Sequence, residues 1–141
     1  LSLLEKPNQS FIVMNGDLIT QVNFQQLLNY HEENGAEATV CVREYSFQVP
    51  YGVARMEQDR LVGIEEKPIH RFFVNAGIYV FQPKVLDLLK SNTVMEMPVL
   101  LDLIRDNGWQ ISVFPIREYW RDIGQIEDYR IANEEIVEEP S

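Results

Sequence analysis

The sequence predicts an α/β fold with a mixed sheet flanked by helices. Apolar strand-like runs alternate with amphipathic helical segments along the chain, which is the order typical of α/β proteins. The 141 residues are 45% apolar, enough to bury the core of one globular domain. No internal repeat or interdomain linker divides them, so we expect one domain over residues 1–141.

The first elements are a strand, a helix and a second strand. Residues 11–15 form an apolar run that leads into Asp17, as expected for a central parallel strand followed by a functional loop. Asn23 suits the N-cap of a helix that Gly35 ends, and residues 37–43 read as the next strand. The helix face predicted to point inward carries Phe24, Leu27, Leu28 and His31.

A hairpin and a further strand follow. Tyr51–Met56 and Leu61–Glu66 are short strand-like runs, and the polar residues between them predict a turn. Asn75–Phe81 is the next predicted strand.

The last third alternates between helices and strands. Proline at the first helical turn predicts helices over Pro83–Leu89 and Pro98–Gly108, the second ended by an Asn-Gly pair. Residues 110–116 alternate as a strand, and Trp120–Asp122 is expected at a strand end or in a loop. Gln125–Ile136 is predicted to be a final amphipathic helix. The apolar stripe of the second helix is predicted to be Val99, Leu100, Leu103 and Ile104.

Charge and hydropathy exclude several classes of partner. The formal net charge is −10, and residues 122–141 hold seven acids against the single base Arg130. This argues against a nucleic-acid partner, which would require a basic surface. No apolar run approaches the roughly 18 residues that span a bilayer, so no membrane partner is expected.

The cysteine and histidines are predicted to be structural. Cys41, the single cysteine, lies in an alternating apolar run, so we expect a buried side chain in a cytoplasmic protein. His31 is predicted to be a hydrogen-bonded histidine on the inner helix face, and His70 to lie in a loop after Pro68. Their spacing does not predict a zinc site.

Two acids occupy similar positions at opposite ends of the sequence. Phe11–Asp17 and Tyr119–Gly124 each deliver an Asp beside a Gly after an apolar run, and such an edge carboxylate is a hard ligand for a divalent cation. Each has an ordinary alternative. The Asn-Gly-Asp of the first is also a common turn or cap, and Asp122 could interact with the dipole of the helix that follows.

Five motifs together resemble the sugar nucleotidyltransferases, and within them the mannose-1-phosphate guanylyltransferases. They occur in the family's order as Val13–Asp17, Tyr51–Val53, Glu66–Pro68, Asn75–Tyr79 and Trp120–Gly124. The resemblance implies a Rossmann-like sheet of the nucleotide-diphospho-sugar transferase type. The family begins with a Gly-rich G-G-x-G-T-R-L loop that this sequence lacks. We therefore expect residues 1–141 to be the C-terminal portion of a single nucleotidyltransferase domain, truncated at the N-terminus, inactive alone and prone to self-association through its exposed sheet edge.

The family transfers a nucleotidyl group from a nucleoside triphosphate to a sugar 1-phosphate and releases pyrophosphate, for nucleotide-sugar and polysaccharide biosynthesis. The resemblance implies that Asp17 and Asp122 are the catalytic carboxylates that hold Mg²⁺. It also implies a substrate-binding set formed by Gly52, Glu66, Lys67 and Asn75. By themselves, the glycine could instead mark a β-bulge and the asparagine the start of a strand.

Two other classes remain as alternatives. The first is a pyrophosphorylase-like regulatory or scaffold module without catalysis, against which the intact acids and Lys67 argue. The second is a glycosyltransferase, whose Asp-x-Asp strand end is absent here. The motifs leave the nucleotide base and the sugar open, because pocket shape determines both.

Overall fold

The computed structural model describes residues 7–90, 94–125, 130 and 133–134. Its main sheet has the strand order β1-β6-β3-β7. The strands are β1 (Phe11–Met14), β3 (Ala38–Gln48), β6 (Ile69–Phe81) and β7 (Ile111–Pro115). β3 and β7 are parallel, whereas β6 is antiparallel to both β1 and β3. The predicted mixed sheet is therefore confirmed.

The prediction of a central parallel strand at residues 11–15 was wrong in its pairing. β1 runs antiparallel to β6 and ends the order of the described strands. Its side chains still pack on both faces, Ile12 against one core cluster and Phe11 and Val13 against the other. A continuous apolar run indicates that both faces of a strand are buried, but it does not indicate whether the strand pairs in parallel or antiparallel.

The first helix has the predicted ends. α1 (Phe24–Asn34) begins after Asn23, whose Oδ1 accepts a hydrogen bond from the Gln26 N–H at 3.0 Å. It ends at Gly35, which adopts φ 65° and donates its N–H to the His31 carbonyl. A glycine is favoured here because this left-handed conformation is costly for other residues.

Two further helical segments are described. They are η1 (Pro83–Leu88), a 3₁₀ helix, and α2 (Met97–Asp106). In α2 the predicted stripe was wrong at Val99, which is 49% exposed, whereas Leu101 packs against the core. The inward face instead follows the i, i+3, i+4, i+7 spacing of Met97, Leu100, Leu101 and Ile104. The helix predicted at residues 125–136 lies largely outside the described residues.

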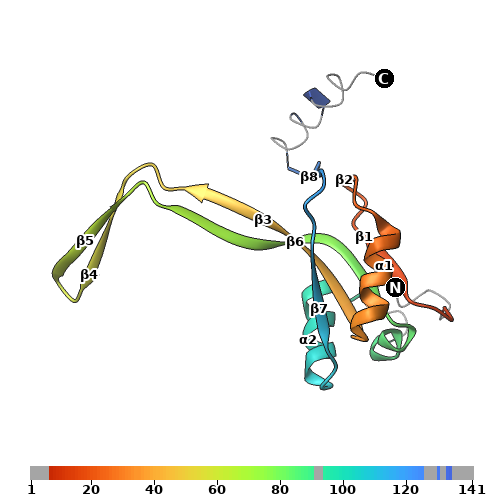
Figure 1. Ribbon diagram of the computed structural model, residues 1–141. Coiled ribbons are helices and arrows are strands. Elements are labelled where there is room, and N and C mark those ends of the chain that lie inside the picture. Colours follow the sequence, from red (N-terminus) through yellow and green to blue (C-terminus); the bar gives the residue numbers. More distant parts are fainter. Residues whose placement is uncertain (1–6, 91–93, 126–129, 131–132, 135–141) are drawn as a thin grey trace.

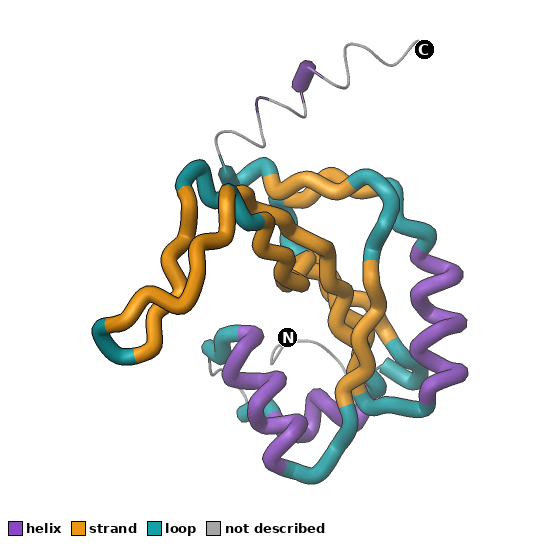
Figure 2. Tube along the Cα trace, turned by 60° about the vertical axis from the view of Figure 1, so that its left-hand side comes forward, coloured by secondary structure: helices purple, strands orange, loops and turns teal. Residues whose placement is uncertain are grey.

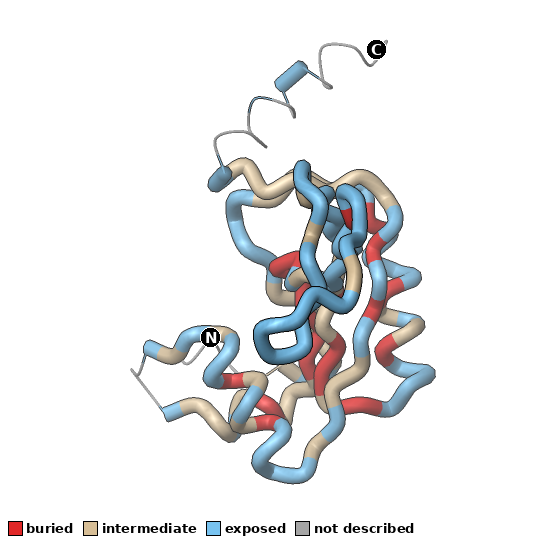
Figure 3. The backbone as a smooth tube through the Cα atoms, turned by 90° about the vertical axis from the view of Figure 1, so that its left-hand side faces the viewer, coloured by how far each residue is buried: buried red, intermediate tan, exposed pale blue. Residues whose placement is uncertain are grey.

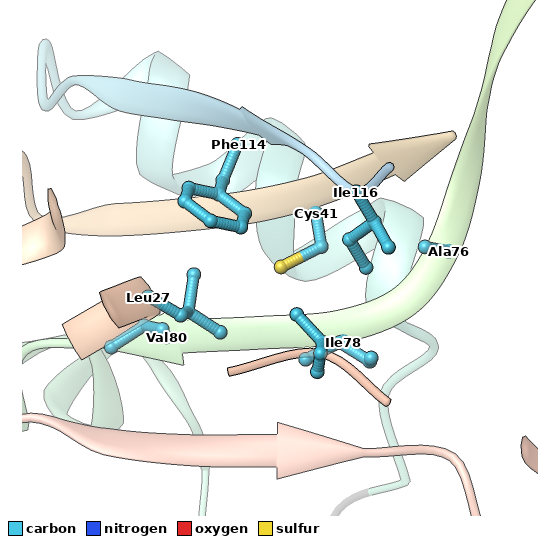
Figure 4. Close-up of a cluster of buried hydrophobic side chains, with 8 residues drawn as sticks. Leu27, Cys41, Ala76, Ile78, Val80, Phe114 and Ile116 are labelled. Carbon is cyan, nitrogen blue, oxygen red and sulfur yellow. The ribbon is translucent and has the colours of Figure 1, made fainter. Parts of the chain in front are cut away.

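The core forms two layers, one on each face of the sheet. Val80 points toward α1, whereas Tyr79 and Phe81 point toward α2 and η1, because successive strand residues face opposite sides. Figure 2 shows helices on both sides of the strands. Cys41 lies within the α1-side cluster (Figure 4) and is fully buried, as predicted; burial raises the pKa of its thiol to about 12.

Beyond the core, β3 and β6 continue as a two-stranded arm. The arm ends in the hairpin of β4 (Gly52–Glu57) and β5 (Arg60–Glu66), which projects away from the helices (Figure 1) and is almost entirely exposed (Figure 3). The predicted hairpin is confirmed, but both long strands extend past their predicted ends. The outer parts of these strands are held by backbone pairing and not by core packing. Their apolar pattern therefore does not show in the sequence where the strands end.

The predicted position of His70 was wrong, because the arm includes it. It lies in β6 opposite Phe47, and its ring stacks on Phe72 with centroids 6.4 Å apart, so it is not in a loop. The proline before β6 suggested a loop, but proline is also compatible with the residue that precedes a strand.

His31 is the buried, hydrogen-bonded histidine that the sequence predicts. It is 1% exposed, and its Nδ1 lies 2.7 Å from Thr39 Oγ1. Burial lowers its pKa below 6.5, although the Glu32 carboxylate opposes the shift. The folded state therefore stabilises the neutral ring.

We expect His31 to make the protein less stable as pH falls below 6.5. The unfolded chain binds a proton in that range and the folded chain does not, so the free energy of unfolding falls by up to about 1.4 kcal/mol per pH unit until the lowered folded pKa is reached. His31→Asn should flatten this slope. Urea unfolding of both proteins between about pH 7.5 and 5 measures it; equal slopes would rule out His31 as the cause.

Candidate active site

The two predicted metal ligands lie at one end of a separate two-stranded ribbon, Asp17 just before its first strand and Asp122 at the end of its second. β2 (Leu18–Thr20) pairs antiparallel with β8 (Trp120–Asp122), and Leu18 lies opposite Asp122. The Asp17 carbonyl also accepts a hydrogen bond from the Ile123 N–H at 2.8 Å. This pairing brings together two acids from opposite ends of the sequence.

Their side chains converge over Gly124. A Cβ added at Gly124 would lie 2.5 Å from Asp17 Oδ2 and 3.0 Å from Asp122 Oδ1. The Gly124 N–H donates to that same Asp122 oxygen at 2.9 Å, which orients the carboxylate. Gly124 was missed as a site residue, although its place two residues after Asp122 was visible in the sequence. It leaves the shared space open.

This arrangement fits a divalent cation. An oxygen of each carboxylate lies within 3.0 Å of one position, that of a Cβ added at Gly124. Asp17 is exposed and Asp122 is half-buried, so an ion and a phosphate can reach them. In the described part of the chain no group of three or more His, Cys, Asp or Glu side chains could hold a metal. The remaining ligands would be water or substrate oxygens, as is usual for Mg²⁺.

A bulge in β6 ties this ribbon to the main sheet. The register between β3 and β6 shifts between Val40 and Val42, and Gly77 in the shifted part of β6 adopts φ 73°. The Ala76 carbonyl accepts from Trp120 Nε1 at 2.8 Å, and the Gly77 carbonyl accepts from the Asn15 N–H at 2.9 Å. The bulge thus anchors the approaches to both acids.

Asn75 lies next to this bulge. Its Nδ2 donates to the Tyr79 hydroxyl at 2.7 Å, and its Oδ1 accepts from the Gly77 N–H at 2.9 Å. It is a mid-strand residue, which corrects the alternative of a strand-start asparagine. Its amide therefore stabilises the bulge whether or not it binds a sugar.

The other predicted substrate residues lie together at the base of the hairpin. Gly52 is paired with Glu66, and a Cβ at Gly52 would lie 3.3 Å from Glu66 Oε2. Lys67 follows with φ 45° and donates its N–H to the Tyr51 carbonyl at 3.2 Å. Gly52, Glu66 and Lys67 are all exposed.

The structure therefore places the six predicted residues in two groups. Asp17, Asp122 and Asn75 lie around the bulge and the ribbon, whereas the hairpin group lies at the far end of the arm (Figure 1). A cavity of about 560 Å³ between α1 and η1 contains none of the six. The sequence order of the motifs did not reveal this separation.

Comparison with known proteins identifies the family. The family model described as "Nucleotidyl transferase" matches residues 1–139. The chain belongs to the nucleotidyl transferase family. This match and the curated relatives that follow together confirm the resemblance to sugar nucleotidyltransferases of the mannose-1-phosphate guanylyltransferase kind.

Curated relatives of this nucleotidyl transferase chain carry consistent names. It is 37% identical over 134 residues to "Probable mannose-1-phosphate guanylyltransferase 1" of Oryza sativa subsp. japonica, covering 90% of this chain and 36% of the relative. It is 33% identical over 133 residues to a mannose-1-phosphate guanyltransferase of Schizosaccharomyces pombe, again covering 90% and 36%. The chain thus spans about 36% of the length of these relatives.

A solved structure supports the fold. HddC from Yersinia pseudotuberculosis, complexed with GMP-PN, matches with a TM-score of 0.63 and 22% identity, over 91% of this chain and 56% of that one. The predicted fold class is confirmed. Within the described residues, no helix is both long and apolar enough to cross a membrane.

Proposed function

We propose that the protein carrying this chain is a Mg²⁺-dependent sugar 1-phosphate nucleotidyltransferase. The observation that carries the proposal is the convergence of the Asp17 and Asp122 carboxylates over Gly124. A family member without catalysis would have no physical need for two acids held at one point, where their charges repel each other in the absence of a cation. This argues against the regulatory or scaffold alternative.

The reaction requires alignment and charge neutralisation more than a protein nucleophile. An oxygen of the sugar 1-phosphate attacks the α-phosphorus of the nucleoside triphosphate, the α–β phosphoanhydride bond breaks, and pyrophosphate leaves. Asp17 and Asp122 would hold the metal ion between them. When bound, Mg²⁺ neutralises charge on the phosphate oxygens. The Gly124 N–H keeps the Asp122 carboxylate oriented during this step.

The hairpin group suits recognition of the sugar phosphate. The Glu66 carboxylate can accept hydrogen bonds from sugar hydroxyls, and the Lys67 ammonium can face a phosphate. The absence of a side chain at Gly52 lets a ligand approach the backbone beside Glu66. Asn75 lies with the two acids at the bulge and away from the hairpin, so its contact with the substrate would be made there, by an amide that the bulge already holds.

Replacing Lys67 is expected to weaken use of the sugar phosphate selectively. Losing a charge-assisted contact should raise the KM for sugar 1-phosphate by roughly 10- to 100-fold in Lys67→Ala and leave the KM for the nucleotide near its original value. Lys90→Ala removes the same charge from an exposed position. Steady-state kinetics measure both constants; an unchanged KM for sugar phosphate would remove Lys67 from the site.

The relatives' names suggest the first substrates to assay, GTP and mannose 1-phosphate. Residues 1–141 lack the Gly-rich loop, whose amides would hold a triphosphate, so we propose that turnover requires residues outside this segment. The full-length protein should be assayed for pyrophosphate release with each nucleoside triphosphate and a panel of sugar 1-phosphates. Release that depends on both substrates and on Mg²⁺ supports the proposal. Sugar phosphate binding without release would instead support the regulatory module.

A further inference from the structure

Trp120 ties the short strand β8 to the main sheet. This residue precedes Asp122 by two positions, and its indole Nε1 donates to the Ala76 carbonyl of β6 at 2.8 Å. Its own carbonyl accepts a hydrogen bond from Arg43 Nη1 at 2.9 Å and a second from Arg121 Nη1 at 3.1 Å. Trp120 is therefore tied to two strands of the sheet, to β6 by its indole and to β3 by its carbonyl.

Arg43 is the distant partner in this cluster. It lies on β3, is half-buried, and pairs across the sheet with Val74. Its guanidinium also lies over the Trp120 ring, 5.7 Å from the centroid. One side chain thus contacts both the carbonyl and the ring of Trp120, by a charge-assisted hydrogen bond and a cation–π contact.

The ribbon needs such support because it is short. β2 and β8 have three residues each, and an isolated pair of antiparallel strands this short is marginal in water. A carboxylate displaced by about 1 Å would no longer share an ion with its partner in productive geometry. A contact that fixes Trp120 against β3 therefore also restricts the position of the Asp122 carboxylate oxygens.

We propose that Arg43 is a positioning residue for the metal site: it fixes Trp120, and through Trp120 it sets the Asp122 carboxylate opposite Asp17. The inference rests on the proposed function. Arg43 acts on the Asp122 carboxylate only through Trp120. Its removal therefore weakens metal binding and leaves sugar phosphate recognition at the hairpin unchanged.

The test compares three variants of the full-length protein. Arg43→Met keeps much of the side-chain length and removes the charge and the donors. Arg43→Lys keeps one cationic donor without the planar guanidinium. Arg71→Met is the matched control, because it removes the same charge from the neighbouring strand, where Arg71 pairs with Glu44 on the exposed arm. Mn²⁺ binding is measured by electron paramagnetic resonance without substrates, and KM for sugar 1-phosphate and the Mg²⁺ dependence of pyrophosphate release are measured separately.

Arg43→Met is expected to raise the Kd for Mn²⁺ and the Mg²⁺ concentration for half-maximal rate by roughly 10-fold or more, with the KM for sugar 1-phosphate unchanged. Arg43→Lys should fall between Arg43→Met and the unaltered protein, and Arg71→Met should match the unaltered protein.

The inference is overturned if Arg43→Met binds Mn²⁺ as tightly as Arg71→Met. If Arg43→Met does not unfold cooperatively, the same comparison is made with Arg43→Lys. An unaltered protein that binds no Mn²⁺ and releases no pyrophosphate would refute the proposed function, and this inference with it. Tight binding and turnover in the unaltered protein, unchanged in the Arg43 variants, refutes the inference alone.

Discussion

Asp17→Asn and Asp122→Asn are each expected to reduce Mg²⁺-dependent pyrophosphate release by roughly 100- to 1,000-fold or more. Asparagine has nearly the same shape as aspartate but lacks the negative charge. Either substitution therefore leaves a single carboxylate at the point where two now converge. One carboxylate neutralises the cation less and fixes it less firmly against the substrate phosphates.

The fold should survive both substitutions. The Asp17 backbone carbonyl keeps its hydrogen bond to the Ile123 N–H, and an amide oxygen at position 122 can still accept from Gly124. Removing one of two like charges also relieves repulsion in the metal-free protein. Asp102→Asn, on the exposed surface of α2, is the matched control. Near-normal turnover in either site variant, with cooperative unfolding retained, would exclude that residue as a metal ligand.

Gly124→Ala is expected to lower the rate by roughly 10-fold or more without a comparable loss of stability. The new Cβ would lie 2.5 Å from Asp17 Oδ2, closer than real Cβ contacts come, and 3.0 Å from Asp122 Oδ1, tighter than most of them. The displaced atoms are the ends of side chains, so the chain can relieve the clash by moving the carboxylates apart. Carboxylates that have moved apart in this way can no longer bind one ion together.

Gly16→Ala provides a control beside the same site. Gly16 directly precedes Asp17, yet an added Cβ there would meet no atom within 4 Å. Its rate and half-saturating Mg²⁺ concentration should match those of the unaltered protein. Steady-state assays at several Mg²⁺ concentrations, with thermal unfolding alongside, separate the two variants. A fully active Gly124→Ala protein would mean that the convergence over Gly124 is not used in catalysis.

Local chemistry made much of the fold predictable. The Asn23 cap, the left-handed Gly35 and the prolines of η1 and α2 mark helix ends because few other residues satisfy those backbone positions. The pairing of strands that are distant in the sequence was harder to predict. The direction of β1 and the extension of β6 through His70 depend on which strands meet, and periodicity does not encode that.

The candidate site shows the same limit. Asp17 and Asp122 could be singled out because each stands within two residues of a glycine after an apolar run, and the structure brings them together. Arg43 gave no local signal, since its partner Trp120 is distant in sequence and is reached only through the fold. The hairpin group was predicted residue by residue, but its distance from the acids depends on the length of the arm.

The most direct test of the central claim is a double-mutant cycle on metal affinity. Mn²⁺ binding would be measured by isothermal titration calorimetry in the full-length protein and in its Asp17→Asn, Asp122→Asn and doubly substituted forms. If the two carboxylates hold one ion, each single substitution should abolish most of the affinity and the double substitution should add little, because the effects of residues that share one ligand are not additive. Single variants that bind Mn²⁺ as tightly as the unaltered protein would show that Asp17 and Asp122 do not form a metal site.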